Sequence, residues 1–318
     1  DSLTASQITI QICEKFGVDL TVKHLFEHPT IQQYAQLLGG MAAPPMRQTA
    51  KIITPAPRTG KLPLALPQER LWFIHQLEPD SAAYNIVQAI SLSGPLDVDA
   101  FRRAFAEMQR RHEILRTRYP SEEGQPFAQI EENVPINFEV VDLRTISQAS
   151  PSETADPAAA YLRNEAPTPF VLSKAPLYRA ILMQVAETEY VFAIILHHII
   201  ADGWAQGVWS GELMALYDAF LKGRGSPLPA LELQYADYAV WQKKWLAQAD
   251  LSGEISYWTQ QMGGDLPVLQ LPADYPRPPM PKYGGTLHSL RIDSRLTESL
   301  KTLARSERCT LFSTLMAA

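Results

Sequence analysis

The stretch YVFAIILHHIIADGW, residues 190–204, is the most informative part of this chain. It opens with apolar, β-branched and aromatic residues, which are typical of a buried strand. A buried strand that ends in two histidines is unusual, because every imidazole nitrogen taken out of water needs a partner. The pair His197 and His198 therefore indicates either a packing requirement or a pocket at the strand end.

Neighbouring side chains on a strand point to opposite faces of the sheet. We therefore expect His198 to face a cavity and His197 to pack internally with its nitrogens bonded. Two histidines on opposite faces cannot share one metal ion, and no Cys or Glu lies nearby at ligand spacing, so no metal site is predicted.

An Asp-Gly pair follows the histidines, and a helix is expected to begin near Trp204. Asp202 can be the N-cap of that helix, and Gly203 can serve a turn. These structural roles stay open, and so does a catalytic role for this turn. A neutral imidazole can take a proton from a nucleophile or hydrogen-bond to it. The N-terminus of the next helix offers backbone N–H groups to a developing oxyanion.

Composition indicates a globular, soluble chain with a sizeable core: of 318 residues, 46% are hydrophobic and 19% are charged. The net charge of −6 argues against a surface that binds nucleic acid. No apolar run reaches about 18 residues, and no signal peptide is recognisable, so no membrane association is expected. Cys13 and Cys309 lie far apart in the sequence. We expect a reduced, cytoplasmic protein.

Four parts follow along the chain. Residues 1–40 are expected to form short helices, and residues 41–61 contain four prolines without a sustained period, which indicates a linker. Residues 62–240 form a mixed α/β unit, and residues 241–318 hold further helices around a proline-rich stretch. Both ends are abrupt, so we expect the chain to be a piece of a longer polypeptide.

The α/β unit is expected to contain strands over 82–94, 136–143 and 177–200, the last with a turn at residues 187–189. A helix is predicted over 97–119, starting near Asp97 or Asp99. Its buried face is predicted to comprise Phe101, Phe105, Met108 and Leu115. A second helix is predicted over 204–223.

The heptapeptide HHIIADG, residues 197–203, fits the HHxxxDG pattern of condensation domains in nonribosomal peptide synthetases. Other acyltransferases that use CoA or carrier proteins share this pattern more loosely. Residues 65–86, 110–119 and 235–242 resemble the first, second and fourth motifs of condensation domains, in the correct order. The resemblance extends from Leu62 onward.

That resemblance implies a chloramphenicol-acetyltransferase-like α/β fold. Residues 62–240 would be the N-terminal lobe of a condensation domain, and residues 241–318 the lobe connection and the start of the C-terminal lobe. Because the catalytic tunnel lies between two such lobes, we expect these residues alone to be inactive, although the protein they come from should be active.

The first 40 residues are similar to the last three helices of a peptidyl carrier protein, on the strength of DSL, FGVDL and LFEHPTI. This resemblance implies an incomplete all-α carrier bundle with 4′-phosphopantetheine attached covalently at Ser2. The alternative is that Ser2 is only a helix cap.

The resemblance to condensation domains also implies roles for individual residues. His198 would be the active histidine and His197 its structural neighbour. Asp202 would be structural and paired with an arginine, for which Arg116 is favoured over Arg111. Gly203 would be a backbone donor on the oxyanion side.

The implied reaction is amide-bond formation, in which the amine of an acceptor attacks a carrier-bound thioester. His198 would act as a general base or only orient the amine. The implied partners are the donor carrier in cis, a downstream acceptor carrier, adenylation domains and a phosphopantetheinyl transferase. The first motif favours a donor of L configuration.

Three alternatives stay open. An epimerization domain has the same fold and histidine motif, and a degenerate condensation-like domain could recruit another protein. A stand-alone acyltransferase that uses CoA is disfavoured by the fused carrier.

Overall fold

The computed structural model describes residues 2–18, 20–28, 30–40, 53–145, 156–270, 272–276, 288, 290–307 and 309–317. The chain divides into two compact units, residues 1–251 and residues 252–318. Within the described ranges, no helix combines the length and apolarity needed to span a bilayer.

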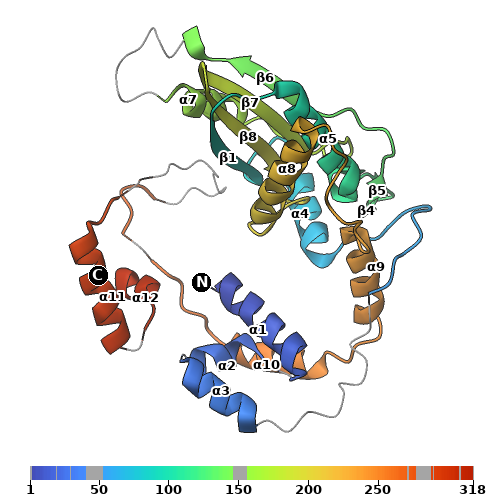
Figure 1. Cartoon of the computed structure of the whole chain (residues 1–318). Helices are drawn as coiled ribbons and strands as arrows, with labels where there is room; N and C mark the ends of the chain where they lie inside the picture. Colours follow the sequence, from blue (N-terminus) through green and yellow to red (C-terminus); the bar gives the residue numbers. More distant parts are fainter. Residues whose placement is uncertain are drawn as a thin grey trace. The chain divides into compact units, whose positions relative to one another are not determined.

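The first unit contains most of the secondary structure (Figure 1). Its helices are α1 (Ser2–Phe16), α2 (Val22–Glu27), α3 (Ile31–Gly40), α4 (Leu66–Leu77), α5 (Val98–Arg111), the 3-10 helix η1 (Glu113–Arg116), α7 (Pro157–Glu165), α8 (Ala205–Leu221) and α9 (Tyr235–Leu246). Its strands are β1 (Asn85–Ser93), β2 (Thr117–Arg118), β3 (Ser121–Glu122), β4 (Gln125–Pro126), β5 (Gln129–Ile130), β6 (Phe138–Asp142), β7 (Tyr178–Ala186) and β8 (Glu189–His197).

A four-stranded sheet in the order β1-β8-β7-β6 organises this unit. β8 pairs antiparallel with both β1 and β7, and β6 pairs parallel with β7. A parallel pair needs a crossover connection, and α7 lies in the segment that joins β6 to β7. The three predicted strand regions are confirmed, as is the turn between β7 and β8.

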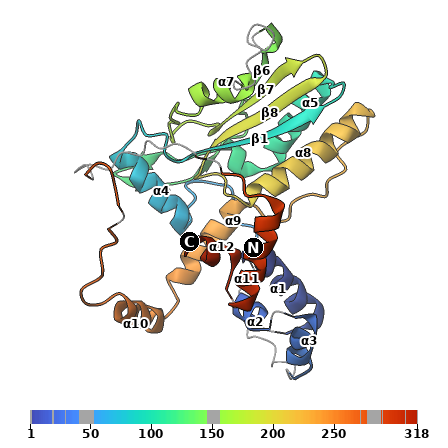
Figure 2. The ribbon, with the colours of Figure 1, turned by 90° about the vertical axis from the view of Figure 1, so that its left-hand side faces the viewer.

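Helices cover both faces of the sheet (Figure 2). The hydroxyl of Tyr178 on β7 hydrogen-bonds to Gln109 of α5. The guanidinium of the next residue, Arg179, donates to the carbonyl oxygen of Glu165 at the end of α7 (3.0 Å). Because neighbouring side chains on a strand face opposite ways, α5 and α7 lie on opposite faces. α8 packs against α5 on the same face.

Aromatic rings form the core between the sheet and α5. Phe101 and Phe105 of α5 are fully buried. The Phe101 ring meets Phe192 of β8 edge-on with centroids 5.0 Å apart, and the Phe105 ring meets Tyr178 at 5.3 Å. Edge-to-face contacts of this kind stabilise a core beyond the area that they bury. The predicted buried positions on this helix are therefore confirmed for Phe101, Phe105 and Met108.

The predicted single helix over 97–119 is wrong in its last third, residues 112–119. Asp97 caps its start by accepting the N–H of Ala100 (2.8 Å), but α5 ends at Arg111. His112 adopts an extended backbone (φ −99°, ψ 104°) that breaks the helical hydrogen bonds, and η1 follows. Leu115 is buried as predicted, from η1 instead of α5.

Residues 53–61, predicted to be part of the linker, are in contact with the lobe. Arg58 forms an ion pair with Asp237 of α9 (2.6 Å), and Leu62 forms an isolated bridge with Ala128. Residues 41–52 of the predicted linker lie outside the described residues.

Three short helices account for the first 40 residues, as predicted. Gly17 ends α1 with a positive φ of 63°, a conformation that glycine adopts without strain. Thr30 caps α3, because its hydroxyl accepts the N–H of Gln33 (3.2 Å). Ser2 is the first residue of α1, but its side chain lies outside the described part of the structure.

The regular secondary structure described in the second unit is helical. Its helices are α10 (Ser252–Gln261), α11 (Ser294–Ser306) and α12 (Leu311–Met316). Asp293 caps α11 by accepting the N–H of Leu296 (2.8 Å).

Candidate functional site

His197 is the last residue of β8, and His198 follows it directly. Their backbone N–H groups donate to segments on opposite sides of β8. The N–H of His197 donates to the carbonyl of Leu177 on the β7 side (3.0 Å). The N–H of His198 donates to the carbonyl of Tyr84 on the β1 side (2.8 Å). The two side chains therefore point to opposite faces, as the strand alternation predicts.

His197 is the internal member of the pair, with 3% of its surface exposed. Its Nδ1 accepts the N–H of Ile199 (3.1 Å), so the proton of the neutral ring is on Nε2. The rings of His75, Tyr84 and Phe170 surround it. Burial lowers the pKa of His197 to about 4, with smaller contributions from His75 and His198. His197 is therefore a neutral residue that holds the turn closed.

Acidification is expected to destabilise the folded chain through His197. The folded-state pKa of about 4 lies below the value of about 6.5 for an unfolded histidine. The unfolded state thus binds the extra proton first, and stability is full above about pH 6.5 and falls as the pH drops towards 4. From pH 7.5 to 5 this amounts to about 2 kcal/mol in the free energy of unfolding.

Urea unfolding of the wild type and of His197→Gln at both pH values measures this contribution. The variant lacks the titrating ring. The difference in the free energy of unfolding between wild type and variant should therefore be smaller at pH 5 than at pH 7.5. An equal acid-induced loss in both proteins would contradict the assignment.

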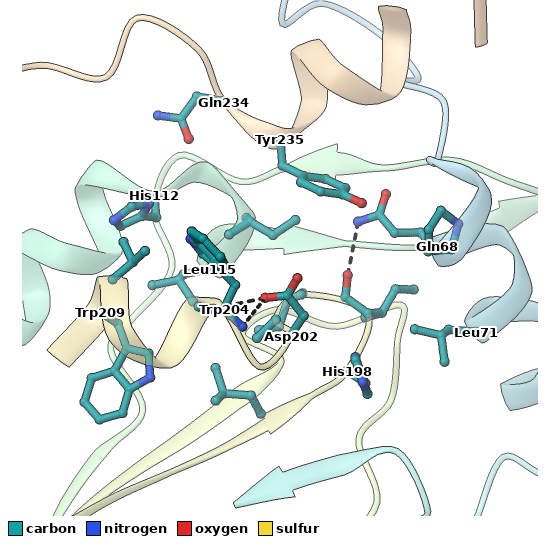
Figure 3. A pocket seen from close by; sticks show the side chains of 18 of the residues that line it. Gln68, Leu71, His112, Leu115, His198, Asp202, Trp204, Trp209, Gln234 and Tyr235 are labelled. Atoms are coloured by element: carbon teal, nitrogen blue, oxygen red, sulfur yellow. Dashed lines mark hydrogen bonds between the residues drawn. The ribbon is translucent and has the colours of Figure 1, made fainter. Parts of the chain in front are cut away.

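His198 is the exposed member of the pair and lines a cavity of about 820 Å³. The cavity wall comes from α4, the end of α5, η1, β8, the turn after it, α8 and the start of α9. Figure 3 shows His198, Asp202 and Trp204 on one side, with Gln234 and the first residue of α9, Tyr235, facing them. Most of the lining is apolar, so the cavity suits an organic chain that leaves few water molecules around the imidazole.

Gln68 of α4 holds the turn beside His198 and was not among the predicted site residues. Its Nε2 donates to the carbonyl of Ile199 (3.1 Å) and to the hydroxyl of Tyr119 (2.8 Å), and its Oε1 accepts the N–H of Ala65 (3.1 Å). The side chain is buried, with 4% exposed. The sequence did indicate the bond to Ala65, since Gln at the third position of a helix often accepts the N–H of the N-cap residue. Its contact with Ile199 had no such signal.

Asp202 caps the turn that leads into α8, although the N-cap residue of that helix is Trp204 and not Asp202. Its Oδ1 accepts the N–H groups of Trp204 and Ala205, both at 3.0 Å. α8 begins at Ala205. The carboxylate is exposed at the edge of the cavity.

The predicted ion pair between Asp202 and an arginine is not formed among the described residues. Arg116 donates instead to the carbonyl oxygens of Gln109 (3.2 Å), Glu131 (2.6 Å) and Arg110 (3.3 Å). Arg111 pairs with Glu212 of α8 (3.1 Å) and donates to the carbonyl of Pro229. Both guanidinium groups are thus engaged elsewhere, which corrects this pairing.

Replacing Asp202 with Ala is therefore expected to lower the free energy of unfolding by about 1 kcal/mol, the usual contribution of a helix cap. Breaking a buried ion pair would cost about 3–5 kcal/mol instead. Urea unfolding of Asp202→Ala, beside Asp80→Ala at an exposed loop position, distinguishes the two values. A loss above about 3 kcal/mol would restore the ion-pair interpretation.

Gly203 lies in the exposed turn between Asp202 and α8 and is not part of the cavity lining. A Cβ added there meets no atom within 4 Å, and the backbone φ lies outside the left-handed region. Neither close packing nor backbone strain therefore requires glycine at this position. Its predicted role as an oxyanion donor stays a prediction.

The site thus combines an accessible imidazole, an apolar cavity and a helix N-terminus in one turn. The imidazole can accept a proton or orient a nucleophile. The start of α8 presents N–H groups, two of which Asp202 already occupies. In the described part of the chain, no group of His, Cys, Asp and Glu side chains is arranged to hold a metal ion.

Similarity to known proteins extends along the whole chain. The condensation domain family model matches residues 58–318, and the model for a phosphopantetheine attachment site matches residues 1–38. A linear gramicidin synthase polypeptide of Brevibacillus parabrevis is 38% identical over 318 residues, and a plipastatin synthase polypeptide of Bacillus subtilis (strain 168) is 34% identical over 318 residues. The chain covers only 4% and 12% of these two relatives.

Solved structures with a similar fold include the X-domain from teicoplanin biosynthesis, with a TM-score of 0.68 and 26% identity over 81% of this chain and 56% of that one. The first condensation domain of the calcium-dependent antibiotic synthetase has a TM-score of 0.65 and 21% identity, over 80% and 58% of the two chains. The predicted chloramphenicol-acetyltransferase-like α/β fold is thereby confirmed.

The chain belongs to the condensation domain family. It is the carrier-then-condensation part of a nonribosomal peptide synthetase, and the match at residues 1–38 implies a phosphopantetheine prosthetic group.

Proposed function

We propose that the protein containing this chain joins two carrier-bound substrates through a new amide bond at His198. The observation that carries the proposal is the exposed imidazole of His198 in an apolar cavity, within the HHxxxDG pattern of the family. The similarity to a linear gramicidin synthase and a plipastatin synthase supports the same class of reaction.

The chemistry requires a neutral amine beside an activated carbonyl. The acceptor nitrogen attacks the thioester carbon, the carbon–sulfur bond breaks, and the thiol leaves with the proton that the amine gives up. Apolar walls disfavour the ammonium form of the amine and so favour the nucleophile. Because the thioester is already activated, holding both groups in one cavity supplies much of the rate.

His198 would either take the amine proton or orient the amine by accepting a hydrogen bond from it. His197 and Gln68 would act through the turn: one holds the N–H of Ile199 and the other its carbonyl. Asp202 would fix the start of α8, and Gly203 would offer its N–H to the oxyanion. Arg111 and Arg116 would stabilise the fold around Glu212 and η1.

Ser2 would carry the prosthetic group of the donor. A serine hydroxyl is the chemical requirement for a phosphodiester link, and Ser2 begins the 15-residue helix α1. The positive end of a helix dipole stabilises a phosphate at this position. When bound, the group supplies a thiol on a long arm that holds the acyl chain as a thioester.

The proposed partners follow from this reaction: an acceptor carrier, adenylation domains that load both carriers and a phosphopantetheinyl transferase. We further propose a donor of L configuration and a cytoplasmic location. Neither nucleic acid nor membrane is a proposed partner.

The test uses the full-length protein loaded at its own carrier with an L-aminoacyl group and mixed with a loaded acceptor carrier. Mass spectrometry of the acceptor should detect the dipeptide. A donor of scrambled configuration without dipeptide would favour an epimerization domain. No change in either carrier would favour a recruitment domain, an option raised by the solved complex of the X-domain with OxyB.

A further inference from the structure

Arg58 occupies a central position between three parts of the fold. Its Nη1 and Nη2 donate to the two carboxylate oxygens of Asp237 (2.6 and 2.9 Å), and its Nε donates to Oε2 of Glu113 (2.7 Å). Asp237 belongs to α9 and Glu113 to η1. A two-pronged contact between guanidinium and carboxylate is among the strongest that side chains form.

Asp237 is almost fully buried, with 1% of its surface exposed. Its oxygens also accept the N–H of Ala56 (2.7 Å) and the N–H of Gln234 (2.7 Å). Burial alone would raise the pKa of Asp237, but the bonds from Arg58 and these two N–H groups outweigh it and lower the pKa to about 2. The buried carboxylate is therefore charged, and two of its three donor residues, Ala56 and Arg58, come from the segment before the lobe.

The same contacts reach the wall of the His198 cavity. Gln234, whose N–H bonds to Asp237, lines the cavity together with Tyr235. The side chain of Gln234 accepts the N–H of Glu113 (3.1 Å) and donates to the carbonyl of Arg111 (2.9 Å). Figure 1 shows the segment after residue 52 running beside α9. The connection to the carrier is thus bonded to the elements that form the cavity wall.

We propose that Arg58, Asp237 and Glu113 form a clasp that anchors the carrier–condensation connection at Ala56 and so restricts how far the carrier can travel from His198. Without the clasp, the first residue that backbone hydrogen bonds hold to the lobe is Leu62, which exchanges two of them with Ala128 (3.1 and 2.8 Å). At about 3.4 Å per residue, the chain from Gly40 reaches at most roughly 55 Å to Ala56 and roughly 75 Å to Leu62. The consequence for transfer rests on the proposed function, whereas the anchoring does not.

Hydrogen exchange of the full-length protein tests the anchoring directly. In Arg58→Ala, the Ala56 amide should exchange at least about 10-fold faster than in the wild type, because its acceptor loses the cation that holds the segment in place. Lys61→Ala is the matched control, since Lys61 lies in the same segment but pairs with Glu122 at an exposed position. That variant should exchange like the wild type at Ala56.

Transfer assays test the restriction of reach. Relative to the wild type, Arg58→Ala should lower transfer from the protein's own loaded carrier by about 1.5- to 2-fold, the effect of a longer tether on effective concentration. Transfer from a separately added loaded carrier to the Ser2→Ala background should not change. Equal losses in both assays, or unchanged exchange at Ala56, would overturn the proposal. Absence of transfer in the wild type would instead refute the proposed function, while the exchange result would still decide on the clasp.

Discussion

Replacing His198 with Ala in the full-length protein is expected to reduce dipeptide formation by at least about 100-fold, the lower range for the loss of a proton-transfer group. The fold should persist, because the imidazole faces a cavity and its backbone supplies the bond to Tyr84. Single-turnover transfer between loaded carriers, followed by mass spectrometry, measures the loss.

His198→Asn distinguishes the two roles that the geometry allows. Asparagine can accept a hydrogen bond from an amine but cannot take its proton at neutral pH. Partial recovery relative to His198→Ala would assign an orienting role, and no recovery would assign a general base. Full activity of His198→Ala would refute both.

Replacing Ser2 with Ala is expected to abolish loading of the carrier altogether, because no hydroxyl would remain at the first position of α1. The intact mass after treatment with a phosphopantetheinyl transferase and CoA should rise in the wild type and stay unchanged in Ser2→Ala. Ser6→Ala, four residues further along the same helix, is the control and should load normally. Loading of Ser2→Ala would place the attachment site elsewhere.

Local sequence patterns predicted the parts of the fold that depend on periodicity. The alternation along residues 190–197 correctly separated His197 from His198, because strand geometry alone fixes which face each residue occupies. The helical spacing of Phe101, Phe105 and Met108 predicted their burial for the same reason. The hydrogen bonds of Asp202 at the turn before α8 were also predictable, since they span only two and three residues.

Contacts between distant segments were not predictable in this way. Arg116 had several acceptors within reach, and backbone carbonyls of neighbouring turns satisfied it in place of Asp202. The Gln68 contact joins residues 131 positions apart, and the Arg58 contact joins residues 179 positions apart. Such choices depend on how the elements pack, which no periodicity in a single sequence records. The break at His112 has the same origin, because its ring bonds to Glu212 of α8 (2.6 Å).

In the proposed reaction, the arm on Ser2 brings its thioester next to His198. The most direct measurement loads the full-length protein with a pantetheine arm that ends in a chloroacetyl group and maps the alkylated residue by peptide mass spectrometry. An imidazole nitrogen that meets this group displaces chloride and forms a stable carbon–nitrogen bond. We expect a cross-link between Ser2 and His198 that is absent from Ser2→Ala and His198→Ala. A cross-link confined to other residues, or alkylation of His198 that persists without Ser2, would contradict it.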